Sequence, residues 1–138
     1  IPFGGGEAKK VTMNGGYEAY ESADGKYLYY AKPVGIEGIW RVPVHGGDEV
    51  QVIDHGRQVS WAVTELGMAL LDSRAKPQSK VEFFGFPIGQ PQVGYLPNGV
   101  RLAPPRAPQF AVTRDGRWMA YVNYDQWGGD IHMLPGSW

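Results

Sequence analysis

The side chains that could act as nucleophiles, bases or metal ligands are few and scattered along the 138 residues. The chain has no cysteine, which excludes disulfides, thiolate metal sites and cysteine nucleophiles. None of its serines stands in the Gly-x-Ser-x-Gly context of a hydrolase nucleophile. His45, His55 and His132 form no i, i+4 pair of the kind that binds zinc on a helix. We therefore expect no catalytic residue, no metal site and no cofactor.

Two glycine-rich stretches and one acidic stretch have the composition of ligand loops but not their spacing. Gly4-Gly5-Gly6 and Gly46-Gly47 lack the Lys-Ser/Thr ending of a phosphate-binding loop and are interpreted as turns. The stretch 125–130 carries two aspartates, but it lacks the alternating oxygen ligands and distal Glu of a calcium loop. We interpret it as a loop between strands.

The overall charge excludes one class of partner. The formal net charge is −1 and the pI is near 6.3, whereas nucleic-acid binding needs a basic patch.

No apolar run approaches the ~20 residues of a membrane span, and residues 1–10 do not resemble a signal peptide. Zero cysteines suit the bacterial periplasm and the cytoplasm equally. The first residue is Ile1 rather than Met, which suggests a piece of something longer.

The elements that must position these side chains are short strands. The chain has 20 Gly, 11 Pro and 13% aromatic residues, a composition typical of many strands joined by turns. Asp24-Gly25 and Asp115-Gly116 are strong tight-turn signals between apolar runs. Together these signals predict strands over residues 8–12, 17–21, 26–30, 38–44, 49–53, 59–64, 68–72, 81–86, 92–96, 109–113, 118–123 and 131–134.

The sequence repeats itself. Residues 1–12, IPFGGGEAKKVT, match residues 42–53, VPVHGGDEVQVI, at an offset of 41 positions. Gly25, Gly67 and Gly116 recur at intervals of 42 and 49 residues, each in a similar context, although the middle copy is degraded. A period in the forties made of short strands is typical of β-propeller blades, with four strands to a blade. A generic β-sandwich is the competing interpretation.

We therefore predict an all-β, β-propeller chain of about three four-stranded antiparallel blades, either a partial ring or half of a six-bladed dimer. Residues 1–12 are expected to form the outer strand of a preceding blade, and residues 13–56 and 57–100 to form two full blades. Residues 101–138 form a blade that lacks its outer strand, and the proline-rich stretch 104–108 serves as a stiff connector.

The repeat motifs resemble the bacterial TolB-type propeller repeat. Asp-Gly-Arg-Trp-Met-Ala-Tyr at 115–121 and Asp-Gly-Lys-Tyr-Leu-Tyr-Tyr at 24–30 carry the resemblance. Ile39-Trp40-Arg41-Val42-Pro43-Val44 with Gly46-Gly47 is similar to that repeat's third strand and following turn, whereas Leu66 departs from its usual Asp. The resemblance implies the C-terminal blades of a larger propeller of six to eight blades. Such propellers occur fused to winged-helix regulators, protein kinases and prolyl-oligopeptidase-type peptidases, and the repeat itself supplies scaffold.

The expected function is a non-catalytic scaffold or sensor segment that binds a protein or a peptide. Loops 31–38, 73–80 and 124–129 join second to third strands and are expected to share one face. The predicted binding residues on that face are Lys32, Arg74, Lys76, Asp125 and Trp127. The alternative is a propeller domain of an enzyme, peptidase-associated or using Glu18 and Glu21 in a central channel as acid and base.

Ring closure leads to one further expectation. Three blades are too few for a ring, so a homodimer of six blades would close it. Residues 1–12 of one copy would then pair beside residues 131–134 of the other.

Overall fold

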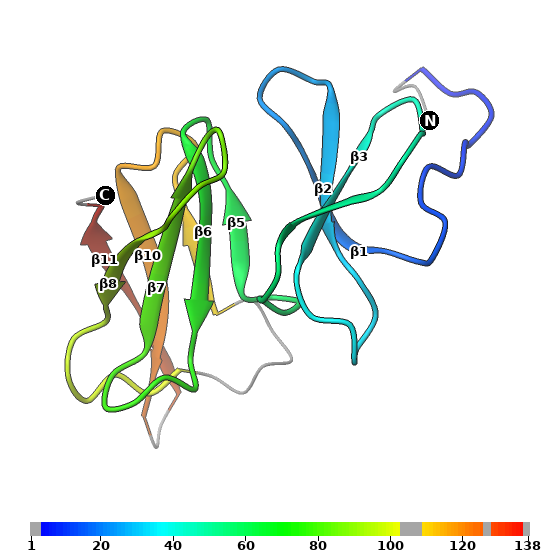
Figure 1. Cartoon of the computed structure of the whole chain (residues 1–138). Helices are drawn as coiled ribbons and strands as arrows, with labels where there is room; N and C mark the ends of the chain where they lie inside the picture. Colours follow the sequence, from blue (N-terminus) through cyan, green and yellow to red (C-terminus); the bar gives the residue numbers. More distant parts are fainter. Residues whose placement is uncertain (1–3, 103–108, 126–127, 137–138) are drawn as a thin grey trace.

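The computed structural model describes residues 4–102, 109–125 and 128–136, which form eleven strands and no helix. The strands make three antiparallel sheets (Figure 1). The first sheet contains β1 (Tyr17–Glu21), β2 (Tyr27–Ala31), β3 (Ile39–Pro43) and β4 (Val50–Ile53). The second contains β5 (Trp61–Val63), β6 (Gly67–Asp72), β7 (Lys80–Gly85) and β8 (Gln92–Tyr95). The third contains β9 (Phe110–Val112), β10 (Trp118–Tyr124) and β11 (Gly129–Pro135).

Each sheet is a meander, in which every strand pairs with the next one along the chain. This confirms the all-β prediction and the predicted strands from residue 17 onward. The third sheet has three strands, as predicted. The sheets do not close into a ring. Among the described residues we find no helix of the length and hydrophobicity that a membrane crossing requires.

The two Asp-Gly turns are built from the same hydrogen bonds. In the first, Asp24 Oδ1 accepts from the Ser22 hydroxyl at 2.7 Å and from the Lys26 amide at 3.1 Å. In the second, Asp115 Oδ1 accepts from the Thr113 hydroxyl at 2.6 Å and from the Arg117 amide at 3.0 Å. The glycine that follows each Asp has a φ near +70°, which L side chains resist. The predicted tight turns with left-handed glycines are confirmed.

The middle copy of this motif is different, and our alignment of Gly67 with the turn glycines is wrong. Gly67 begins β6, and its φ is not positive. Its amide and that of Leu66 donate to the Thr64 hydroxyl, which closes a shorter turn. A Cβ at Gly67 would lie 2.1 Å from the Phe84 carbonyl oxygen, so the residue is required for close approach of β7.

The second sheet is buried on both faces because its side chains alternate between two cores. Met68, Leu70 and Phe84 pack against the first sheet, in a cluster that includes Tyr29 and Ile39. Their neighbours along the same strands belong to a second cluster shared with the third sheet, whose members are Ala69, Leu71, Val81, Phe83, Leu96, Phe110, Met119 and Tyr121. Strands β6 and β7 are therefore buried at nearly every position rather than at every second one, and Glu82 on β7 is a buried charged residue.

Residues 8–12 are not a strand in this structure, and their assignment to the outer strand of a preceding blade stays a prediction. The segment lies instead against the outer face of the first sheet, where the Met13 amide donates to Glu49 Oε1 at 2.7 Å. The Lys9 ammonium donates to the His45 carbonyl oxygen. Gly16 lies so close to the Tyr30 ring that a Cβ there would be 3.0 Å from Cδ2. These contacts engage the segment with its own chain rather than leaving it as an unpaired strand.

Candidate functional site

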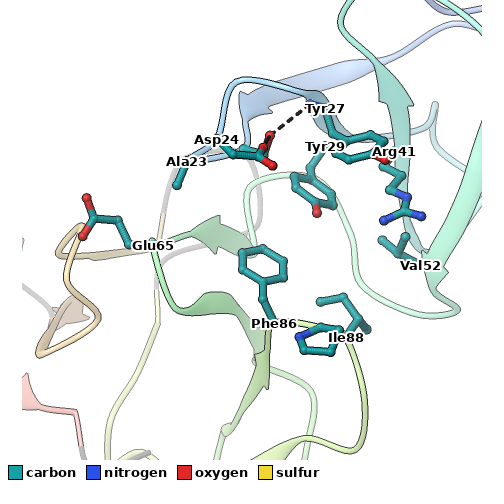
Figure 2. Close-up of a pocket in the computed structure, with 11 residues that line it drawn as sticks. Ala23, Asp24, Tyr27, Tyr29, Arg41, Val52, Glu65, Phe86 and Ile88 are labelled. Carbon is teal, nitrogen blue, oxygen red and sulfur yellow. Dashed lines mark hydrogen bonds between the residues drawn. The ribbon is translucent and has the colours of Figure 1, made fainter.

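An open cleft of about 610 Å³ lies between the first and second sheets, beside the β1–β2 turn (Figure 2). Its apolar wall comes from aromatic and aliphatic side chains of both sheets, and its rim carries charged groups. The lining residues are Ser22, Ala23, Asp24, Tyr27, Tyr29, Arg41, Val52, Glu65, Phe86, Pro87 and Ile88. The cleft lies at one end of the core that joins the two sheets, because Tyr29 belongs to that core and Tyr27, Val52, Phe86 and Ile88 pack against it.

Strand alternation and pairing register place the first sheet's contribution. Tyr27 and Tyr29 are two positions apart on β2 and therefore face the same way. Arg41 pairs with Tyr29 across the β2–β3 ladder, which puts the guanidinium beside both tyrosines. The Arg41 guanidinium carbon lies 4.7 Å from the centre of the Tyr27 ring, a cation–π contact.

The second sheet supplies the opposite wall through the segment that follows β7. The Phe86 amide donates to the Leu66 carbonyl oxygen at 2.9 Å, which fixes the backbone there. Its ring stacks on Tyr29 with centroids 5.7 Å apart and planes 21° from parallel. Figure 2 shows these two rings facing each other, with Arg41 and Val52 on one side and Glu65 at the far end. The wall is therefore held in place by both backbone and ring contacts.

The acidic groups on the rim are already engaged. Asp24 accepts from the Ser22 hydroxyl and the Lys26 amide, and these bonds hold the pKa of its carboxyl below the usual range. Its other oxygen lies 3.3 Å from the Lys26 ammonium. Glu65 Oε1 lies 2.7 Å from Arg114 Nε, a residue that precedes the Asp115-Gly116 turn of the third sheet. Both rim carboxylates therefore have cationic partners outside the cleft.

Arg41 differs from the rim residues. Burial raises the pKa of the Tyr29 phenol, and the adjacent Arg41 guanidinium opposes that shift by hydrogen bonding and charge. No carboxylate of residues 4–102, 109–125 or 128–136 forms an ion pair with Arg41. The cleft thus combines an aromatic wall with a cation whose neighbours are two tyrosines. This arrangement can bind an apolar group and an anion at the same time.

The predicted binding residues have dissimilar surroundings. Lys32 is only 6% exposed; its ammonium lies 2.8 Å from Glu49 Oε2 and 3.7 Å from the centre of the Trp40 ring. This leaves little of its side chain for a partner. Arg74, Lys76 and Asp125 are exposed, and Arg74 lies 3.8 Å from Asp72. Trp127 lies outside the described residues.

The loops that carry these residues do share one end of the molecule. Strands β2, β6 and β10 all run toward the lower end of the view in Figure 1, so the segments that follow them emerge on the same side. The contribution of Arg74, Lys76 and Asp125 to binding stays a prediction.

The candidate acid and base of the enzyme alternative are also placed. Glu18 has a φ of +50° and reaches from β1 to the second sheet, where its Oε2 accepts from the Val59 amide and, at 3.2 Å, from Trp61 Nε1. Glu21 is exposed at the end of β1. The contacts of Glu18 therefore tie the first two sheets together.

The three histidines have separate partners. His55 bridges the first two sheets, with Nδ1 2.7 Å from Asp54 and Nε2 2.8 Å from Glu82. His132 stacks on Tyr121 with centroids 5.3 Å apart, and the His45 carbonyl engages Lys9. Within the part of the chain that the structure describes, no group of three His, Asp or Glu side chains is arranged to hold a metal ion.

Sequence reasoning did not identify the cleft. Tyr27, Tyr29 and Arg41 appear in the sequence analysis only as parts of repeat motifs, and Phe86 only as the end of a predicted strand. The position of Arg41 was the signal that could have revealed the cleft. Arg41 stands two residues after Ile39 on the same strand, and Ile39 and its paired residue Ile53 are core residues on the inner side of the sheet. A charged residue two positions from a fully buried one, on the same face, marks the edge of a core.

Comparison with protein-family models finds no match for the chain, and a search of curated proteins finds no significant relative.

Proposed function

We propose that this chain is a segment of a TolB-type β-propeller and acts as a non-catalytic scaffold that binds a protein or a peptide. Three features support the propeller. The sheets are meanders of three or four strands, they pack face to face in chain order, and in two of them the same Asp-Gly turn joins the first strand to the second. The glycines of these two turns, Gly25 and Gly116, lie 91 positions apart, about two blade periods in the forties.

The observation that carries the binding function is the cleft between the first two sheets. Its volume of about 610 Å³ is in the range of ligand sites, and it combines an aromatic and aliphatic wall with charged groups at the rim. Tyr29 is buried and Phe86 stacks on it, so the wall is formed before a ligand arrives. A preformed apolar wall lowers the entropic cost of binding.

The enzyme alternative receives less support from the same geometry. It relied on Glu18 and Glu21 as an acid and base pair, whereas the Glu18 carboxylate is engaged with Val59 and Trp61. Those contacts give the Glu18 carboxylate a structural role between the first two sheets.

The test is a binding screen of the purified chain against an immobilised peptide library, followed by calorimetry on the best binders. Phe86→Leu removes the stacked ring but keeps an apolar side chain. Tyr95→Leu makes the same kind of change at a residue on β8 that is 60% exposed and does not line the cleft.

We expect Phe86→Leu to weaken binding by at least about tenfold, since aromatic anchors dominate such sites. Tyr95→Leu should leave the affinity unchanged. The proposal fails if no peptide binds the folded chain, or if both variants bind as the wild type does.

A further inference from the structure

Resting on the proposed function, we infer that the cleft recognises a carboxylate attached to a large apolar group, and that Arg41 binds the carboxylate. The apolar group would lie on the wall made by Phe86 and Ile88. Both the charge and the wall are needed, so the inference specifies a class of peptide ligand rather than any peptide.

Arg41 differs from three exposed arginines of the chain, each of which forms an ion pair. Arg57 Nη2 lies 2.8 Å from Glu37, and Arg114 Nε lies 2.7 Å from Glu65. Arg74 Nε lies 3.8 Å from Asp72. These pairs are largely exposed, where an ion pair contributes little. Arg41 is half-buried, yet its described neighbours are the Tyr27 ring and the Tyr29 phenol.

The Arg41 guanidinium shares the cleft with apolar side chains. Val52 and Ile88 are apolar, and both line the cleft with it. A charge beside such groups is less well hydrated than one on an open surface, so its attraction to an anion is stronger. The Tyr27 ring holds the guanidinium from one side, which pre-organises its donors. A guanidinium can donate two parallel hydrogen bonds to one carboxylate.

The carboxylates that line the cleft do not bind Arg41. The acids that line the cleft are Asp24 and Glu65, and their partners are Lys26 and Arg114. The Asp24 carboxylate is also fixed by the Ser22 hydroxyl, whose donation lowers its pKa. Neither acid forms an ion pair with Arg41 in the described structure, so a ligand carboxylate has a cation to bind.

The carboxylate can come from two sources with the same chemistry: the C-terminus of a peptide or an Asp or Glu side chain. Three acetylated peptides distinguish them: Gly-Gly-Phe with a free C-terminus, Gly-Gly-Phe amide, and Asp-Phe-Gly amide. Isothermal titration calorimetry of each peptide against the wild-type chain gives the affinities. Arg41→Gln removes the charge, and Arg41→Lys keeps the charge but loses the paired donors.

We expect at least one of the two peptides with a carboxylate to bind about tenfold or more tightly than Gly-Gly-Phe amide. Which of the two binds identifies the source. Arg41→Gln should reduce that peptide to the affinity of the amide, and Arg41→Lys should retain part of the preference. Unchanged melting temperatures would show that the variants are folded.

Two results would overturn the inference in different ways. Equal binding of all three peptides, weakened for each by Phe86→Leu, would contradict the role of Arg41 and leave the binding function standing. Absence of binding by any of the three peptides to the folded wild type would contradict the ligand class. If the library screen also yields no binder, the proposed function fails with it.

Discussion

The outer faces of the first and third sheets carry similar side chains but differ in what covers them. On the first sheet, Tyr30 is 1% exposed and Val42 is fully buried, with Gly16 of the N-terminal segment against the Tyr30 ring. On the third sheet, Ile131 is 76% exposed, and Met133 is more than half exposed. Strand alternation puts apolar residues on both faces of each sheet, and neighbouring chain segments decide which of those faces are buried.

The covered face also holds an internal charge pair that the open face lacks. Lys32 Nζ and Glu49 Oε2 are 2.8 Å apart, and both side chains are nearly inaccessible. Donation from Lys32, with a further bond from the Met13 amide, lowers the pKa of Glu49 to about 2, against the effect of burial. Glu49 therefore links the sheet to the segment that covers it, and losing it should have the largest effect.

We predict that Glu49→Ala destabilises the chain by about 3 kcal/mol, because it leaves the Lys32 ammonium buried without a partner. Urea unfolding followed by tryptophan fluorescence measures this. The double variant Lys32→Met with Glu49→Leu should recover much of the loss, since no charge then remains. An equal loss in both variants would show that packing rather than charge explains the effect.

The Lys32–Glu49 pair also predicts that the folding stability falls in acid. Because the folded pKa of Glu49 is lowered, its contribution is present above the unfolded value of about 4.3 and is lost as the pH falls toward 2. Stability of the wild type should fall over this window, and less so in Glu49→Gln. Identical pH slopes for the two proteins between pH 5 and 2 would contradict the assignment.

Removing the N-terminal segment that lies against the first sheet should have the next largest effect on stability. Deletion of residues 1–16 should destabilise the chain by about 1–2 kcal/mol, because Gly16 no longer lies against the Tyr30 ring and part of that side chain becomes exposed. Binding of a hydrophobic dye should rise at the same time. If neither stability nor dye binding changes, the segment does not cover this face in solution.

The junction between the first two sheets is predicted to respond to pH in the opposite direction to Glu49. Burial lowers the pKa of His55, but hydrogen bonds and charge from Asp54 and Glu82 raise it by more, with Lys80 also bound to Glu82. A raised pKa gives stability that is full below about 6.5 and is lost as the pH rises through the folded value. The imidazole is partly exposed, so we expect less than about 1 kcal/mol. Melting temperatures from pH 6 to 8 should fall in the wild type and stay flat in His55→Gln.

The open face should give the smallest effect on stability. Ile131→Lys replaces an exposed side chain on an edge strand, and we expect a change within about 0.5 kcal/mol. If copies of the chain associate through this face, sedimentation should show a weaker complex for the variant. A large loss of stability in the monomer would mean that the face is covered after all.

Local signals in the sequence predicted the strands and turns, but not which neighbour each face meets. Asp24-Gly25 and Asp115-Gly116 are set by adjacent residues, so their turns were predictable. Lys32 was predicted to lie in an exposed loop, because its partner Glu49 is 17 residues away and no local pattern links them. Residues 8–12 were predicted as a strand because residues 1–12 match residues 42–53, but a strand forms only beside a partner strand. Hydrogen bonds of Lys9 to His45 and of Met13 to Glu49 hold this part of the chain instead.

The cleft was hidden for the same reason. Arg41 and Phe86 come from different sheets, and their proximity depends on how those sheets pack. Gly67 shows a related limit: it occupies the place of a turn glycine in the repeat, but its role is to let β7 approach.

Native-state amide hydrogen exchange tests the stacked arrangement of covered and open faces most directly. We predict the slowest exchange in β6 and β7, which lie between two sheets, and the fastest exchange in β11, at the edge of the third sheet. Exchange in β2 and β3 should be intermediate. Protection of β11 equal to that of β6, or rapid exchange in β2 and β3, would contradict this arrangement.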